Sequence, residues 1–124
     1  MTMITCHALD AVSGHHAAGL RVRLMLVRDN ETDRELLFDL ATDEGGRLHV
    51  PVDLGPAAAD GDRCEICFEL GAYVACQHPD RSGGPARMQA LVIRFSPDQH
   101  ATRLHFPVSI TPASASVLML ALAE

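Results

Sequence analysis

The chain has 124 residues, of which 48% are hydrophobic, 4% are aromatic and none is tryptophan, and its formal net charge is −6. A chain of this length and apolar content is expected to fold as one domain with an aliphatic core, which we place at residues 1–124. It has no run rich in lysine or arginine, so we expect no nucleic-acid partner. No apolar run reaches the ~18 residues of a membrane span, so we expect no membrane partner either.

The first residues lack a charged segment followed by a hydrophobic stretch, which is the pattern of a secretory signal. Disulfides are rare in proteins that stay in the reducing cytoplasm. We therefore expect the four cysteines to be reduced thiols and the protein to be cytoplasmic.

Short segments of alternating apolar and polar residues, separated by turn signals, predict an all-β domain. The alternation is strict in residues 20–26 and returns in residues 64–70, where two glutamates occupy the outward positions. A short helix is predicted near residues 71–78 and a loop in the Gly- and Pro-rich run at 78–85. About eight strands in this length predict a β-sandwich, whose two sheets bury alternate residues between them. The predicted strands are residues 4–10, 20–26, 35–42, 48–52, 64–70, 90–95, 101–110 and 114–122.

Three polar side chains that are far apart in the sequence, His7, Arg47 and His105, fall at predicted strand ends or turns. A neutral histidine can act as a base toward water, because its pKa lies near working pH. An arginine can stabilise the negative charge that develops on a carbonyl oxygen, and a second histidine can orient the water or protonate a leaving nitrogen. This trio suits hydrolysis of a cyclic amide or imide. From the residue types alone, a solvated or structural role is the commoner alternative for each side chain.

Each member of the trio lies within a short run that resembles a known motif. Residues 4–10 contain His-Ala-Leu-Asp, residues 42–47 read Thr-Asp-Glu-Gly-Gly-Arg, and residues 105–112 read His-Phe-Pro-Val-Ser-Ile-Thr-Pro. In this order the runs resemble the 5-hydroxyisourate hydrolase branch of the transthyretin-like family. The resemblance covers most of residues 4–112, and it differs in detail: His16 stands where proline is usual.

The resemblance implies a transthyretin-like β-sandwich with one short helix. It also implies a homotetramer whose active site lies at a subunit interface and contains His7, Arg47 and His105 as catalytic residues. The hormone-carrier branch of the family has lysine at the position of His7, so this chain is more similar to the enzymes. The implied function is a hydrolase that opens the ring of 5-hydroxyisourate or a related heterocycle. We expect no metal or organic cofactor, because base, acid and oxyanion stabiliser are all available as side chains.

The chain departs from the hydrolase pattern after Pro112. The hydrolases end in Tyr-Arg-Gly-Ser, and the corresponding residues 118–121 are Leu-Met-Leu-Ala. A cation and hydroxyl groups are thus replaced by aliphatic groups, which predicts a less polar pocket. We expect Ser114, Ser116 and Met119 to bind the substrate there.

The C-terminal run at 117–122 is also apolar on both faces of a predicted strand. One core can cover only one face, so a partner subunit is expected on the other.

Other candidate sites fit the predicted strands less well. Cys64 and Cys67 have the spacing of a redox or metal motif, but residues three apart in a strand lie on opposite faces. We therefore expect Cys64 in the core and Cys67 outside it or at an interface. A zinc ion held by His7, His105 and water is an alternative, although no third protein ligand is evident and Arg47 would repel the ion.

Three functions remain open from the sequence. The first is hydrolysis of 5-hydroxyisourate, and the second is a diverged enzyme of the same fold that acts on a different cyclic substrate. The third is a non-catalytic carrier of an apolar ligand. His7 favours the two enzymes, whereas the aliphatic residues at 117–122 favour the second and third functions.

Overall fold

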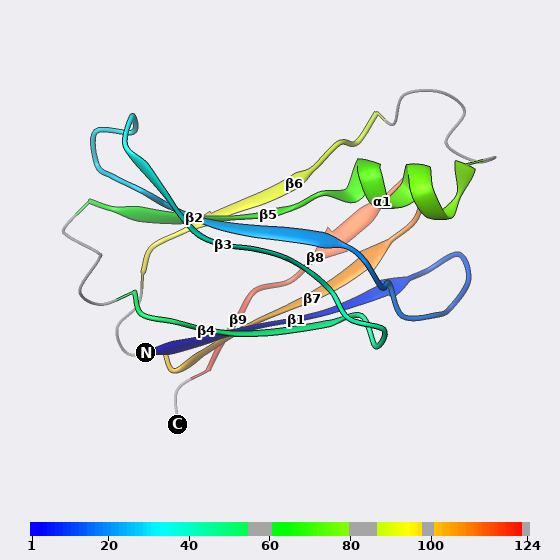
Figure 1. Cartoon of the computed structure of the whole chain (residues 1–124), viewed down its shortest axis with the longest axis horizontal. Helices are drawn as coiled ribbons and strands as arrows, with labels where there is room; N and C mark the ends of the chain where they lie inside the picture. The colour runs from blue at the N-terminus through cyan, green and yellow to red at the C-terminus, as the bar shows by residue number, and fades with distance from the viewer. Residues whose placement is uncertain (55–60, 80–86, 98–100, 123–124) are drawn as a thin grey trace.

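The computed structural model describes residues 1–54, 61–79, 87–97 and 101–122, and these residues form two β-sheets packed face to face (Figure 1). The first sheet has the order β4-β1-β7-β8, and β9 also pairs with β7. The second sheet has the order β3-β2-β5-β6. Every pairing is antiparallel except that of β1 with β7, which is parallel. The elements are β1 (Thr2–Asp10), β2 (Arg21–Val27), β3 (Arg34–Ala41), β4 (Arg47–Val52), β5 (Arg63–Phe68), α1 (Leu70–Gln77), β6 (Leu91–Phe95), β7 (Arg103–Ile110), β8 (Ala115–Val117) and β9 (Leu120–Leu122).

The predicted β-sandwich with one short helix is confirmed, and its core follows the predicted alternation. In β2 and β5 every second residue is fully buried between the sheets. Phe106 of β7 joins the two layers, because its ring lies 6.0 Å from that of Phe68 and 6.1 Å from that of Phe95, centre to centre. Burying a side chain of this size contributes roughly 1.5–3 kcal/mol, so these contacts fix the two sheets against each other.

The predicted C-terminal strand at 114–122 differs from the structure in one respect, since it is divided into β8 and β9. Both pieces pair with β7 in one continuous register, from Ile110 opposite Ala115 to Arg103 opposite Leu122. The division falls opposite Pro107, which has no N–H to donate to the ladder. The ladder keeps one bond there, from the Leu118 N–H to the Pro107 carbonyl at 3.1 Å.

The helix α1 begins one residue earlier than predicted, at Leu70, and packs at one end of the sandwich (Figure 1). Leu70 was expected as the last inward residue of a strand; it is buried as expected, but it opens the helix. No helix in the described part of the chain has the length and apolar character that crossing a membrane requires. Most of the predicted loop at 78–85 lies outside the described residues.

A buried carboxylate joins α1 to the end of β1. Asp10 is 3% exposed, and its Oδ2 accepts hydrogen bonds from the Tyr73 hydroxyl at 2.9 Å and from His78 Nε2 at 2.5 Å. Its Oδ1 accepts from the backbone N–H groups of Val12 and Ser13. Burial alone would raise the pKa of Asp10, but these hydrogen bonds, led by that of His78, outweigh it and lower the pKa to about 2.

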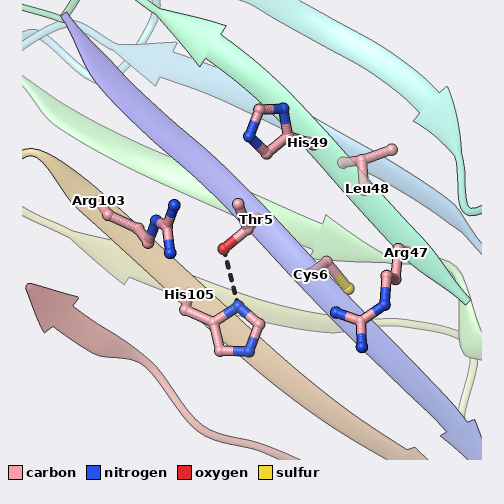
Figure 2. Close-up of a pocket in the computed structure, with 7 residues that line it drawn as sticks. All are labelled: Thr5, Cys6, Arg47, Leu48, His49, Arg103 and His105. Carbon is pink, nitrogen blue, oxygen red and sulfur yellow. Dashed lines mark hydrogen bonds between the residues drawn. The ribbon is translucent and has the colours of Figure 1, made fainter.

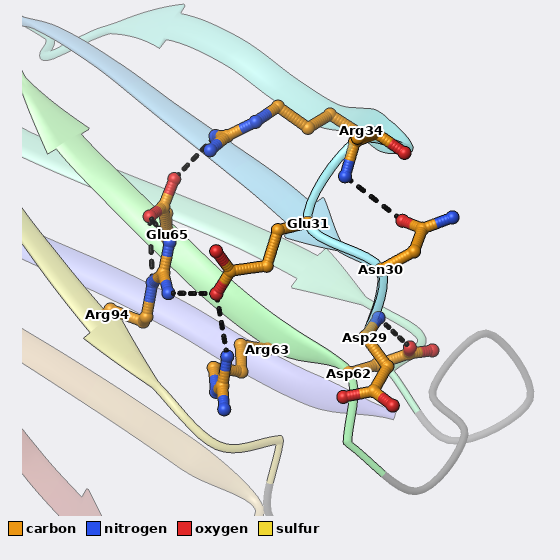
Figure 3. Close-up of polar contacts among 9 residues, drawn as sticks. Asp29, Asn30, Glu31, Arg34, Asp62, Arg63, Glu65 and Arg94 are labelled. Atoms are coloured by element: carbon orange, nitrogen blue, oxygen red, sulfur yellow. Dashed lines mark hydrogen bonds and ion pairs between the residues drawn. The ribbon is translucent and has the colours of Figure 1, made fainter.

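The outer face of the second sheet carries a network of ion pairs (Figure 3). Glu65 of β5 accepts from Arg34 at 2.6 Å and from Arg94 at 2.8 Å. Glu31, in the turn after β2, pairs with Arg94 at 3.0 Å and with Arg63 at 3.1 Å. Exposed pairs of this kind each contribute about 0–1 kcal/mol. They hold the β2–β3 turn over β5 and β6, while the catalytic candidates lie on the first sheet.

We predict that Asp10→Asn lowers the free energy of unfolding by about 1–3 kcal/mol at neutral pH, because an amide NH₂ then faces donors that need an acceptor. An acid with a lowered pKa in the folded state stabilises the fold above its unfolded pKa, and this contribution is lost as pH falls toward the folded value. The difference between variant and wild type should therefore shrink between about pH 4 and pH 2. Urea denaturation at several pH values measures it.

Asp39→Asn serves as the control, because Asp39 forms an exposed ion pair with Arg21. Its loss should cost less than about 1 kcal/mol. Equal losses in the two variants would contradict the anchoring role of Asp10.

Candidate functional site

The candidate site lies on the outer face of the first sheet, and β1 forms its centre. Ile4, Cys6 and Ala8 are buried in the core. Because successive residues of a strand point to opposite faces, Thr5 and His7 project outward between them.

Strand register brings the predicted catalytic residues together from three neighbouring strands. His7 of β1 lies directly opposite Arg47 of β4, and Thr5 lies opposite both His49 of β4 and His105 of β7. Directly opposed residues in a sheet have Cβ atoms about 4.5–5.5 Å apart. The structure therefore places His7, Arg47 and His105 on one face of three neighbouring strands, with Arg47 and His105 on either side of β1.

The turn before β4 sets the position of Arg47. The carboxylate of Asp43 accepts hydrogen bonds from the backbone N–H groups of Gly45 and Arg47, both at 2.9 Å. Gly46 has φ +70°, and a Cβ there would lie 2.4 Å from the carbonyl oxygen of Ala8. A side chain at this position would thus push β4 away from β1, so glycine is required for Arg47 to lie beside His7.

An open pocket of about 210 Å³ lies over these strands (Figure 2). His105 projects into it, and its Nδ1 is 2.7 Å from the Thr5 hydroxyl. His7 is not among the lining residues and lies next to Arg47 at the edge of the pocket. The lining residues are Thr5, Cys6, Arg47, Leu48, His49, Arg103 and His105.

His7 has a second histidine as its partner. Its Nε2 lies 3.1 Å from Nδ1 of His16, and the two ring centres are 5.1 Å apart with the rings tilted by 37°. His16 comes from the segment that follows β1 and forms an isolated bridge with Leu9.

The surroundings of both site histidines favour the neutral imidazole. Burial lowers the pKa of His7, and the charges of Arg47, His16 and His105 lower it further, while Asp43 acts in the opposite direction. Burial also lowers the pKa of His105, with additional effects from Arg103 and Arg47. Two neutral imidazoles beside a guanidinium supply a base, a proton donor and a fixed positive charge.

The predicted substrate-binding residues occupy different places. Ser116 lies on the outer face, opposite Ser109 of β7. Ser114 belongs to the β7–β8 turn, where its hydroxyl is 2.8 Å from that of Thr111. The structure does not bring Met119 to this face, because its side chain packs against the core; Leu118 and Leu120 take the outward positions instead.

The outward leucines form an apolar margin along the site. Leu120 lies opposite His105 and is 43% exposed, and Leu122 lies opposite Arg103 and is 47% exposed. Leu118, between β8 and β9, is 61% exposed. The polar pocket is thus bordered by an aliphatic strip, in agreement with the apolar replacement expected from the sequence.

Three pocket residues were missed by the sequence analysis: Thr5, His49 and Arg103. Each lies two positions from a member of the trio, so the period of a strand places it on the same face. The two-residue period of a strand is therefore the signal in the sequence that could have identified these three residues. His100, the other histidine near β7 in sequence, lies outside the described residues.

The cysteine motif is divided between two faces as predicted, with Cys64 buried and Cys67 directed outward. Burial raises the pKa of the Cys64 thiol to about 11, so this thiol is a weak nucleophile. Within the residues that the structure describes, no three histidine, cysteine or acidic side chains are grouped closely enough to hold a metal ion.

Comparison with known proteins identifies the fold family. A family model described as HIUase/Transthyretin family matches residues 4–118. The chain belongs to this family. A family member from Mesorhizobium japonicum, named 5-hydroxyisourate hydrolase, is 31% identical over 109 residues, which cover 88% of this chain and 84% of that protein.

Two solved structures of the family are similar throughout. The 5-hydroxyisourate hydrolase of Klebsiella pneumoniae has a TM-score of 0.64 and 26% identity, with coverage of 98% of this chain and 100% of that one. Sea bream transthyretin in complex with thyroxine has a TM-score of 0.76 and 16% identity, with coverage of 96% and 95%. The similarity to sea bream transthyretin supports the fold alone.

The Gly46 turn gives a direct prediction. Gly46→Ala should destabilise the protein by about 1–3 kcal/mol or more, because a non-glycine residue at positive φ is strained and its Cβ would meet the Ala8 carbonyl. Gly45→Ala is the matched control, since a Cβ there meets only Asp43 Oδ1, at 3.4 Å. Thermal unfolding of both variants measures the difference. Similar melting temperatures would show that the turn does not fix β4 against β1.

Proposed function

We propose that the protein is a hydrolase that opens the ring of a cyclic amide, with 5-hydroxyisourate or a related heterocycle as substrate. The observation that carries the proposal is the placement of His7, Arg47 and His105 on one face of three adjacent strands. The family relatives named 5-hydroxyisourate hydrolase support the reaction class.

Each side chain has a chemical role in the proposed reaction. Neutral His7 removes a proton from water, which attacks the ring carbonyl carbon. The guanidinium of Arg47 stabilises the oxyanion that forms. The Thr5 hydroxyl lies 2.7 Å from Nδ1 of His105; if it donates there, the proton of neutral His105 is on Nε2. That proton passes to the ring nitrogen as the C–N bond breaks, and the proton that His7 took from water returns to His105, so both imidazoles end neutral. Water thus supplies the hydroxyl of the new carboxyl group, and no step requires a metal or organic cofactor.

We also propose a homotetramer whose sites lie at a subunit interface. Leu118, Leu120 and Leu122 leave an apolar strip on the outer face of the first sheet, and monomers rarely expose such strips beside a polar site. A second copy of the chain laid over this strip would cover the leucines and enclose the pocket.

A second candidate function has its own supporting observation. The leucine strip lies where Leu120 is opposite His105, and an aliphatic wall favours an apolar ligand over a polar ring. This favours either a diverged enzyme with a different cyclic substrate or a carrier that binds an apolar ligand without turnover. A measurement of turnover distinguishes an enzyme from a carrier, because only an enzyme converts the molecule that it binds.

The assay follows the absorbance of 5-hydroxyisourate, freshly made from urate, with and without the protein. The proposal predicts decay well above the spontaneous rate and in proportion to protein concentration. Decay at the spontaneous rate would overturn 5-hydroxyisourate as the substrate, and failure with other cyclic amides and lactones would overturn the hydrolase.

The catalytic trio gives a mutational prediction. His7→Ala, Arg47→Ala and His105→Ala should each lower turnover by roughly 10²–10⁴, the usual effect of losing a general base or an oxyanion donor. Double variants should lose little more than single ones, because groups that act together are not additive.

The control is His15→Ala, an exposed histidine outside the pocket, which should stay near wild type. His49 is unsuitable because it lines the pocket. Folded trio variants that keep activity within a few-fold of wild type would refute the assignment.

The reaction should depend on pH through the base. Only neutral His7 accepts a proton, so kcat/KM should rise as pH rises through its pKa and then level off. Because burial and the nearby cations lower this pKa below 6.5, the half-maximal rate should fall below pH 6.5 and the plateau should include neutral pH. A pH–rate profile measures the midpoint, and a midpoint above the ordinary histidine value would contradict a neutral His7 base.

The proposed assembly predicts a mass near four times 13.4 kDa in light scattering at micromolar concentration. Leu120→Asp should shift the protein toward smaller species, because a charge would be buried in the interface. Leu36→Asp, an exposed leucine of the second sheet, is the control. A wild-type mass of one chain would rule out the tetramer.

A further inference from the structure

We propose that His16 is a positioning residue for His7. Its Nδ1 accepts a hydrogen bond from Nε2–H of His7 and so leaves His7 Nδ1 as the nitrogen that takes the proton from water. The inference rests on the proposed hydrolase function and assigns a role to a residue outside the trio. The sequence resemblance gives proline as the usual residue at this position, so the contact distinguishes this chain from the usual pattern.

The backbone around His16 is held firmly against β1. The Asp10 N–H donates to the His15 carbonyl at 2.8 Å, and the Ala17 N–H donates to the Ala8 carbonyl at 2.8 Å. Hydrogen bonds on both sides of His16 therefore fix its main chain to the strand that carries His7. The His16 ring therefore extends from main chain that is hydrogen-bonded to β1 on both sides.

The turn before Arg47 also lies close to the segment that carries His16. A Cβ placed on Gly46 would lie 3.2 Å from the His16 Cβ and 3.1 Å from the Ala17 nitrogen. The exposed His16 thus lies close to the turn that leads into β4. It lies beside both His7 and the strand that supplies the oxyanion stabiliser.

The atoms that face each other decide the chemistry. The 3.1 Å contact joins Nε2 of His7 to Nδ1 of His16, and a neutral imidazole has one N–H donor and one acceptor nitrogen. If His7 donates, its proton is on Nε2 and its Nδ1 lone pair is free for the reaction. A base needs that free lone pair, so the catalytic role of His7 selects this arrangement. In histidines, the hydrogen bond made by one ring nitrogen commonly fixes which nitrogen carries the proton.

The charges around His7 act in the same direction. Arg47 from β4, His105 from β7 and His16 all disfavour the imidazolium, and Asp43 from the turn before β4 favours it. Removing the His16 ring should therefore free the His7 tautomer and raise its pKa toward the ordinary value.

Imidazole ¹⁵N NMR of the full-length protein tests the pairing directly, with the His7 signals assigned from a His7→Gln variant. In wild type we expect a single His7 tautomer protonated on Nε2 and a pKa below 6.5. In His16→Ala we expect mixed tautomers and a higher pKa. His16→Asn should restore the single tautomer, because an Asn carbonyl oxygen lies close to the position of the His Nδ1. His15→Ala is the matched control and should leave the His7 signals unchanged.

A second experiment measures kcat, KM and the pH–rate profile of the same variants with 5-hydroxyisourate as substrate. We expect His16→Ala to lower kcat by about ten-fold, a part of the 10²–10⁴ that a general base contributes, and to move the midpoint of the pH–rate profile upward. KM should change little, and His16→Asn should recover most of kcat.

The outcomes separate the two proposals. Unchanged His7 nitrogen shifts in His16→Ala would overturn the pairing, whether or not the protein turns over this substrate. Changed shifts with unaltered kcat and pH midpoint would overturn the catalytic role. If wild type turns over neither 5-hydroxyisourate nor other cyclic amides and lactones, the hydrolase proposal fails, and with it the catalytic role of His16, while the NMR result still decides the pairing.

Discussion

The pairing of β1 with β4 on one side and β7 on the other is the constraint on which the candidate site depends. Because side chains alternate along a strand, a slip of one residue would turn every outward group into the core. The buried Ile4, Cys6 and Ala8 prevent such a slip in β1, since their positions cannot exchange with Thr5 and His7 without placing polar groups in an aliphatic core. The interactions that stabilise the sandwich therefore also fix the positions of the site residues.

Two features near the C-terminal end of β1 reinforce that register. Gly46 allows the turn before β4 to approach the Ala8 carbonyl, and Asp10 ties the strand to α1 through Tyr73 and His78. The site side chains consequently project from strands and not from loops. Strands hold catalytic groups more rigidly than loops do, which suits a reaction carried by side chains alone.

The electrostatic character of the site follows from what the strands place beside each histidine. Arg47 and Arg103 flank His105, and Arg47 and His16 flank His7. Burial is the largest cause of the lowered pKa values of both histidines, and these charges add to it, which keeps the imidazoles neutral and a positive charge available for an oxyanion. The outer face of the second sheet differs, because there the charges of Arg34, Glu65 and Arg94 are paired with one another and are not free to stabilise a reacting group.

Most of the fold and part of the site could be predicted from the sequence. Strict alternation in β2 and β5 reveals which residues are buried, since it depends only on local geometry. The contact of His7 with His16 was not predictable, because it depends on how the segment after β1 folds back on the strand. The inward position of Met119 has a similar cause: the phase of the C-terminal strand is set by its register with β7, and a shift of one position exchanges Met119 for Leu118 or Leu120.

The central claim is that the polar pocket, and not the leucine strip beside it, binds the heterocycle. A crystal structure of the protein with urate, a stable purine trione, tests this most directly. We expect the ring in the pocket, with a carbonyl oxygen on the Arg47 guanidinium and a ring nitrogen within hydrogen-bond distance of His105. A ring that lies against Leu118 and Leu120 without touching Arg47 or His105 would contradict it, and would favour a carrier of apolar ligands.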